Sequence, residues 1–223
     1  MASEQKSPIS LEYKGRVAII TIDNQQKLNA LNQAAYYDLA QKLREIATHD
    51  EVFITVLLAK GRYFSAGADV TIARASPSAG DVDIHKHWLQ NFVAFNLNIT
   101  HAFSTHPKIL VVGLNGPVAL IMSRRISADQ LVQAGFVNAI FDVEKGDDAR
   151  FHELVLREVD ERLGEHLSGS SLLGIKKLIR RPELEVTNEQ NVHEVFAGLE
   201  RFVQGIPQEE FRKIASGEKK HKL

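Results

Sequence analysis

The chain has 223 residues, with 27 Lys and Arg against 28 Asp and Glu, and a net charge of −1. This length suits one domain, or one domain with a helical arm, and the balanced charge offers no basic surface to a nucleic-acid backbone. The absence of cysteine excludes disulfides and thiolate chemistry, and no apolar run is long enough to cross a membrane. The N-terminal residues lack the apolar core of a secretion signal, so we expect an intracellular globular protein.

The first third of the chain contains a strand pattern followed by a helix pattern. The short β-branched run 17–22 predicts a strand, and residues 11–13 are its expected hairpin partner. Asn32 is a suitable N-cap for a helix that ends near His49. The apolar positions of this helix recur at helical spacing: Leu39, Leu43 and Ile46.

The middle of the chain repeats this alternation. The runs 53–59 and 109–114 are too continuously apolar for strands that expose one face to water. Between them, residues 87–103 predict a long helix. Strands alternating with helices indicate an α/β fold with a parallel sheet and crossover helices.

The alternation fails after residue 117. We expect a short helix over 119–125, then a capping box from Ser127 to Gln130 that opens a helix ended by Gly135. Residues 136–141 predict a weak strand. The remaining chain predicts helices over 149–166, 172–180, 188–203 and 207–215.

Three loops are candidates for a functional site. Segment 61–70 follows a buried strand, and its small residues expose backbone N–H groups that can hold an anion or a developing oxyanion. A tight turn chosen only for its geometry is the alternative. Segment 28–31, between strand and helix, is by itself a loop that says nothing about function. Segment 114–117 follows the last strong strand, where ligands gather in open parallel sheets, but taken alone a loop that ends a strand is the better interpretation.

Together, in this order and at this spacing, these segments resemble the enoyl-CoA hydratase/isomerase (crotonase) superfamily, and within it the fungal peroxisomal enoyl-CoA isomerases. The likeness spans almost the whole chain and includes residues 27–31, 61–69, 111–117, 127–136 and 174–178. It implies a crotonase-like spiral of ββα units, here truncated, over residues 1–145. A C-terminal helical region, 146–217, would build trimers or hexamers, and a tail follows over 218–223.

The resemblance also implies a site for an acyl-CoA thioester, with no metal or other cofactor. Ala68 matches the residue whose backbone N–H forms part of the family's oxyanion hole. The loop that would line the acyl pocket consists of Ala66, Gly67, Ala68, Asp69 and Val70. The residues that would contact CoA are Leu28, Ala30, Leu31, Lys176 and Lys177. For the two lysines, a solvated helix face is the alternative.

A block that the family carries is missing here near residues 118–120. In the family it supplies the second oxyanion N–H and the catalytic glutamate, and this chain has no Glu between Glu51 and Glu144. Loss of one donor alone should cost about 3 kcal/mol of oxyanion stabilisation. We therefore assign no catalytic acid or base, although replacements are conceivable at Asp69, Asp81, Asp83, His85 and His87.

The resemblance thus implies enolate chemistry on unsaturated acyl-CoA, in fatty-acid oxidation or in the synthesis of fatty-acid-like toxins. The alternatives are a catalytically inactive paralogue that binds acyl-CoA or joins an intact relative's oligomer, and a product that does not fold. The ending His221-Lys222-Leu223 resembles the Ser-Lys-Leu address, which predicts a peroxisomal location and an import receptor as partner. A chance basic ending is the other interpretation.

Overall fold

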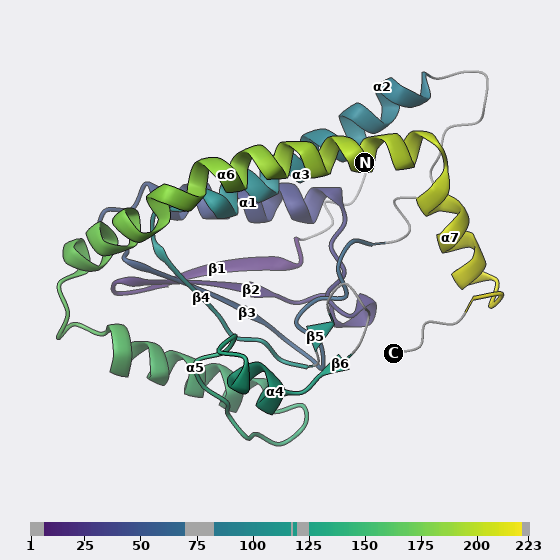
Figure 1. Cartoon of the computed structure of the whole chain (residues 1–223). Helices are drawn as coiled ribbons and strands as arrows, with labels where there is room; N and C mark the ends of the chain where they lie inside the picture. The colour runs from purple at the N-terminus through teal and green to yellow at the C-terminus, as the bar shows by residue number, and fades with distance from the viewer. Residues whose placement is uncertain (1–6, 70–82, 117, 120–124, 220–223) are drawn as a thin grey trace, which may run out of the picture.

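The computed structural model describes residues 7–69, 83–116, 118–119 and 125–219 (Figure 1). Val70, Asp81 and the tail residues 221–223, all named above as candidates, lie outside the described residues. In the part of the chain that is described, no helix is long and apolar enough to cross a membrane.

Four strands form the central sheet in the order β1-β2-β3-β4. Strands β1 (Ile9–Lys14) and β2 (Val17–Ile22) form an antiparallel hairpin. Strands β3 (Ile54–Ala59) and β4 (Ile109–Val112) then continue the sheet in parallel. Every residue of β3 is buried. This confirms the strand predicted from its continuous apolar run. A central strand that is covered on both faces exposes no side chain to water, so its residues need not alternate between apolar and polar.

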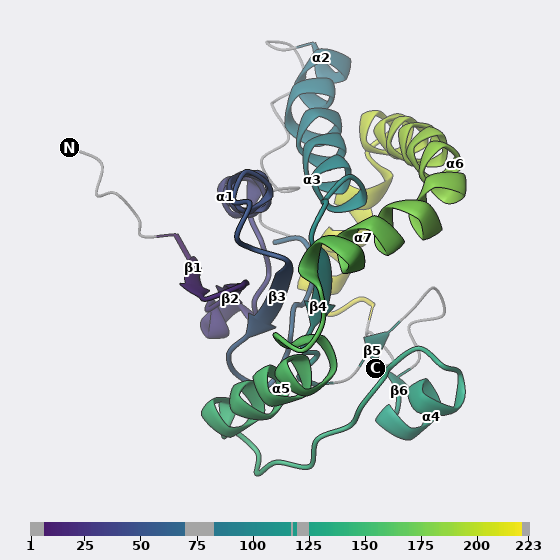
Figure 2. The same ribbon diagram turned by 90° about the vertical axis from the view of Figure 1, so that its left-hand side faces the viewer.

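Helices cover both faces of the sheet (Figure 2). Helices α1 (Gln33–Ala47) and α3 (Ala94–Ser104) lie on one face, and α5 (Asp148–Leu163) lies on the other. The Asn32 side chain accepts a hydrogen bond from the Ala35 N–H and caps α1 as predicted. The predicted apolar positions of α1 are all buried against the sheet: Leu39, Leu43 and Ile46.

The helix predicted over 87–103 is longer and less regular than its sequence suggested. It begins as α2 (Ile84–Trp88), passes through a π-helical turn, η3 (Leu89–Val93), and continues as α3. The Trp88 ring is buried here, with its centroid 4.7 Å from that of Phe202 near the end of the chain. Aromatic packing of this kind fastens the C-terminal helices to the α2–α3 segment.

The helices predicted over 172–180 and 188–203 are one continuous helix, α6 (Gly169–Val203), of 35 residues. Proline usually breaks a helix, yet Pro182 lies inside this one. Contacts on both sides hold it in place: Lys176 reaches the main chain before β4, and Leu199 packs in the cluster around Trp88. Helix α7 (Ile206–Ala215) then ends the described chain close to its predicted bounds.

The middle of the chain departs most from prediction. The helix predicted over 119–125 is wrong at both described ends, where β5 (Val118–Ala119) and β6 (Arg125–Ile126) pair as antiparallel strands. The capping box of Ser127 and Gln130 does open a helix, α4 (Ala128–Gln133), and Gly135 follows its end with a φ of 68°. The strand predicted over 136–141 is absent.

Candidate functional site

The turn at 28–31 and the loop at 66–69 lie side by side, although 35 residues or more separate them in sequence. The Ala66 N–H donates to the Leu28 carbonyl, at 2.9 Å. The Leu31 N–H donates to the Gly67 carbonyl, and the Asp69 N–H donates to the Leu31 carbonyl, both at 2.9 Å. The segments follow β2 and β3, so this short parallel pairing continues the sheet past its carboxyl edge.

Asn29 holds this arrangement together. Its side chain is 1% exposed, and its Nδ2 donates to the carbonyls of Lys60 at 2.8 Å and Tyr63 at 2.7 Å. Its Oδ1 accepts from the Asn24 N–H at 2.7 Å. The residue has a φ of 57°, a left-handed conformation that Asn tolerates better than most residues. Sequence reasoning missed this role, since an amide in a turn is by itself only a weak signal.

The third loop joins the same cluster. The Phe64 N–H donates to the Asn115 carbonyl at 2.7 Å, and the Asn115 side-chain amide donates to the Gly61 carbonyl. Gly116 has a φ of 94°, and a Cβ there would collide with the carbonyl oxygen of Arg62. The structure thus brings together the three loops that the sequence singled out, and close backbone packing explains the glycine.

The backbone N–H of Ala68 points away from the 28–31 turn. In this parallel bridge Leu31 bonds to the residues on either side of Ala68, so the N–H and C=O of Ala68 itself face the opposite way. Within the described ranges this N–H donates to no acceptor, and Ala68 is exposed. A free N–H on a loop of small residues can donate to a carbonyl oxygen or an oxyanion.

Two of the candidate replacement bases, Asp69 and Asp83, have other roles in the structure. Asp69 is buried and its carboxylate lies 2.7 Å from the Lys27 ammonium. Asp83 caps α2 by accepting from the Lys86 N–H at 3.0 Å. His85 is exposed on the same helix. No group of three His, Cys, Asp or Glu residues in the described parts of the chain could hold a metal ion.

The structure does not bring Lys176 or Lys177 to the loops at 28–31 and 66–69. Lys176 Nζ donates to the carbonyl of His106 at 2.7 Å and to that of Lys108, both just before β4 begins. This is the amino edge of the parallel strands, whereas the loops follow their carboxyl edge. Burial lowers the pKa of Lys176, and Lys177 is exposed on α6.

His106 is a buried imidazole at that amino edge. Its Nε2 lies 2.8 Å from the Thr55 hydroxyl oxygen on β3. Its pKa is lowered to about 4, mainly because burial disfavours the imidazolium, with the charges of Lys176 and Lys108 adding to the effect. The folded protein therefore holds His106 neutral at pH values where an unfolded chain would protonate it.

We expect the free energy of unfolding to fall by about 3 kcal/mol as the pH drops from 6.5 to 4. Over this range the unfolded state binds a proton at residue 106 and the folded state does not, so acid favours unfolding. Urea titrations at several pH values measure the effect. His106→Gln has no titrating group and should show a flatter pH dependence. Equal slopes for the two proteins would show that His106 is not the cause.

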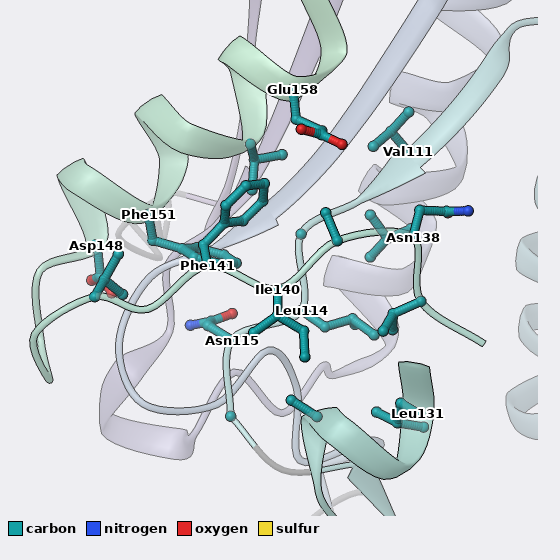
Figure 3. A pocket seen from close by; sticks show the side chains of 18 of the residues that line it. Val111, Leu114, Asn115, Leu131, Asn138, Ile140, Phe141, Asp148, Phe151 and Glu158 are labelled. Carbon is teal, nitrogen blue, oxygen red and sulfur yellow. The ribbon is translucent and has the colours of Figure 1, made fainter. Parts of the chain in front are cut away.

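A groove of about 1350 Å³ lies between β4, α5 and residues 136–148, and we call it the β4 groove (Figure 3). The rings of Phe141 and Phe151 and the side chains of Leu114 and Ile140 give it an apolar interior. One end reaches Asn115 and so adjoins the loop cluster. Sequence reasoning did not foresee a groove here.

Residues 17–119 match the family model described as Enoyl-CoA hydratase/isomerase. The chain is 50% identical to the Delta(3,5)-Delta(2,4)-dienoyl-CoA isomerase of Pyricularia oryzae, in an alignment covering 96% of this chain and 98% of that protein. It is 28% identical to the 3,2-trans-enoyl-CoA isomerase of Saccharomyces cerevisiae, with 98% of each covered.

Solved structures share the fold. An enoyl-CoA hydratase/isomerase from Mycobacterium paratuberculosis aligns with a TM-score of 0.72 at 17% identity, covering 96% of this chain and 99% of that one. The enoyl-CoA hydratase from Bacillus halodurans aligns with a TM-score of 0.66 at 16% identity, covering 91% and 98%. At such low sequence identities these alignments are evidence for the fold alone. They confirm the predicted crotonase-like architecture.

The alignments with the two fungal relatives are longer than the chain itself. That with the Pyricularia oryzae protein spans 275 positions, although 96% of 223 residues is only about 214. About 60 positions of the alignment therefore lack a residue of this chain. The family match ends at Ala119, next to the point where we predict the missing block.

Proposed function

Because this chain belongs to the enoyl-CoA hydratase/isomerase family, we propose that it binds unsaturated acyl-CoA thioesters with the thioester oxygen at the Ala68 N–H. The observation that carries the proposal is the direction of this N–H, set by the pairing of segments 28–31 and 66–69. The names of the fungal relatives suggest 3-enoyl-CoA and 3,5-dienoyl-CoA as substrates.

Enolate chemistry explains why this N–H matters. Removal of a proton next to the thioester carbonyl leaves negative charge on its oxygen, and a fixed N–H donor stabilises that charge. A base must take the proton and return it further along the acyl chain for the double bond to move. This chain retains the matching donor residue and has no glutamate between Glu51 and Glu144. We therefore propose that it binds these thioesters but turns them over poorly.

Replacing Ala68 tests the role of its N–H. Ala68→Pro removes the donor, and we expect roughly 3- to 10-fold weaker binding of a trans-3-enoyl-CoA, measured by calorimetry, because one neutral hydrogen bond is lost. Ala68→Ser keeps the N–H and should bind within about twofold of the unchanged protein. Thermal melts must show that both variants fold. Equal affinity of the proline variant would contradict the placement of the thioester oxygen.

A role inside an oligomer is the second candidate function. The first half of α6 exposes an apolar stripe at helical spacing, consisting of Ile175, Leu178, Ile179 and Val186. We propose that this stripe packs on the helices of neighbouring subunits, in a trimer or hexamer of this chain or of an intact relative. Sedimentation should show a trimer or hexamer with the unchanged chain and no species of three or more subunits with Leu178→Lys. A trimer or hexamer that Leu178→Lys leaves intact would count against it.

We also propose import into peroxisomes through the last three residues, His221-Lys222-Leu223. The support is their likeness to the Ser-Lys-Leu address together with the family's acyl-CoA chemistry. A fluorescent protein fused ahead of the chain should enter peroxisomes only when these three residues are present. A diffuse signal from the complete fusion would refute this proposal and leave the binding proposal untouched.

A further inference from the structure

Strand β4 is an edge strand with a free row of backbone groups. The Ile109 N–H donates to the carbonyl of Phe53, just before β3, at 2.9 Å. The N–H of Gly113, just after β4, donates to the Leu57 carbonyl on β3 at 3.0 Å. Because N–H directions alternate along a strand, the N–H and C=O groups of Leu110 and Val112 face the other way, into the β4 groove. Within the described residues, no strand pairs with this side of β4.

A second unpaired segment lines the same groove. Residues 136–141 have the composition of a strand, but in the structure they are irregular. The backbone groups of residues 138–141 form no hydrogen bond to any described residue. The β4 groove is thus bordered by two stretches of chain that could each pair with a strand.

The alignments explain why the β4 groove has these unpaired edges. The family match ends at Ala119, at the end of β5 and seven residues past β4, and about 60 positions of the Pyricularia oryzae alignment have no counterpart here. The groove is lined by β4, which lies before that point, and by residues 126–163, which follow it. The block missing from this chain would lie between β4 and residues 126–163. Without it, both stretches lack the neighbouring segments that the block would supply.

The chemistry of the groove favours a strand over a small molecule. Its volume of about 1350 Å³ exceeds that of a typical small-molecule pocket. An acyl chain could cover the apolar walls but could not satisfy the free groups of Leu110 and Val112, and burying them unpaired is unfavourable. A strand satisfies them and covers the apolar walls as well.

We propose that the occupant is a second copy of this chain, with β4 of one copy paired antiparallel to β4 of the other across a two-fold axis. An edge strand is self-complementary in this arrangement, so one contact satisfies both edges and joins two sheets into one. The charges permit it: four acidic and three basic side chains line the groove, and Glu158 pairs with Arg162. No strong field of one sign would hold two copies apart.

Sedimentation of the full chain carrying Leu178→Lys tests this pairing, because that change removes the separate association proposed for α6. We expect a dimer. Adding Ile140→Lys, at a groove residue 46% exposed, should raise the dissociation constant roughly 30-fold or more by burying an unpaired charge. Adding Val132→Lys instead is the matched control, since Val132 is 44% exposed and does not line the groove. This control should stay dimeric.

Hydrogen exchange supplies a readout specific to the strand. The amides of Leu110 and Val112 should become protected as protein concentration rises, in step with dimer formation. Val112→Pro removes one of these donors without breaking a bond to β3 and should also give monomers. A monomeric Leu178→Lys protein, or a dimer insensitive to Ile140→Lys, would overturn the proposal. So would protection of these amides in a monomer, because another segment of the same chain would then cover the edge.

Discussion

The purified full chain is expected to isomerise 3-enoyl-CoA and 3,5-dienoyl-CoA at least about 10⁴-fold more slowly than the Pyricularia oryzae relative. General base catalysis contributes about 10²- to 10⁴-fold, and one oxyanion donor about 10²- to 10³-fold. The resemblance places both contributions in the missing block. The sequence offers no glutamate between Glu51 and Glu144 to replace the base. Product formation by the two proteins, followed side by side by chromatography, measures the difference.

The candidate replacement bases define the control experiment. Asp83 caps α2 and His85 is exposed on that helix, so Asp83→Asn and His85→Gln should leave any residual rate unchanged within about threefold. The protein must unfold cooperatively and bind the thioester before a low rate is informative. A rate close to that of the relative would show that another residue supplies the base, and a sharp fall in one variant would identify it.

Asn29→Ala is expected to lower the free energy of unfolding by about 3–5 kcal/mol. The change removes hydrogen bonds to the Lys60 and Tyr63 carbonyls and from the Asn24 N–H, and each is worth about 1 kcal/mol. Alanine at a φ of 57° adds about 1–2 kcal/mol of backbone strain. Urea denaturation measures the loss. Thioester binding should weaken too, because Asn29 holds the turn that pairs with residues 66–69.

Two further variants separate the loss of the Asn29 hydrogen bonds from the backbone strain of alanine at this position. Asn29→Gly removes the same hydrogen bonds without the left-handed strain, so it should be about 1 kcal/mol more stable than Asn29→Ala. Asn96→Ala is the matched control elsewhere, because Asn96 makes one side-chain bond, to the Phe92 carbonyl within its own helical segment. We expect a loss below about 1 kcal/mol there. Similar losses for Asn29→Ala and Asn96→Ala would refute the structural role assigned to Asn29.

Local sequence patterns were sufficient for most of the helices and strands. The hairpin, the buried strand 54–59, the Asn32 cap and the capping box of Ser127 depend on residues close together in the chain, and all four are present. The three loops were also recognisable from their residues and their order. Their resemblance to one family is confirmed by the 50% identical relative.

The sequence by itself therefore determined the family, the fold class and the positions of the three loops, because periodicity and short motifs are local properties. Only the tertiary structure decided how distant segments meet. It showed that Asn29 ties the loops together, that Lys176 is used at the opposite edge of the sheet, and that α6 runs through Pro182. It also showed that residues 136–141 are not a strand, because a strand exists only where a neighbouring chain accepts its hydrogen bonds.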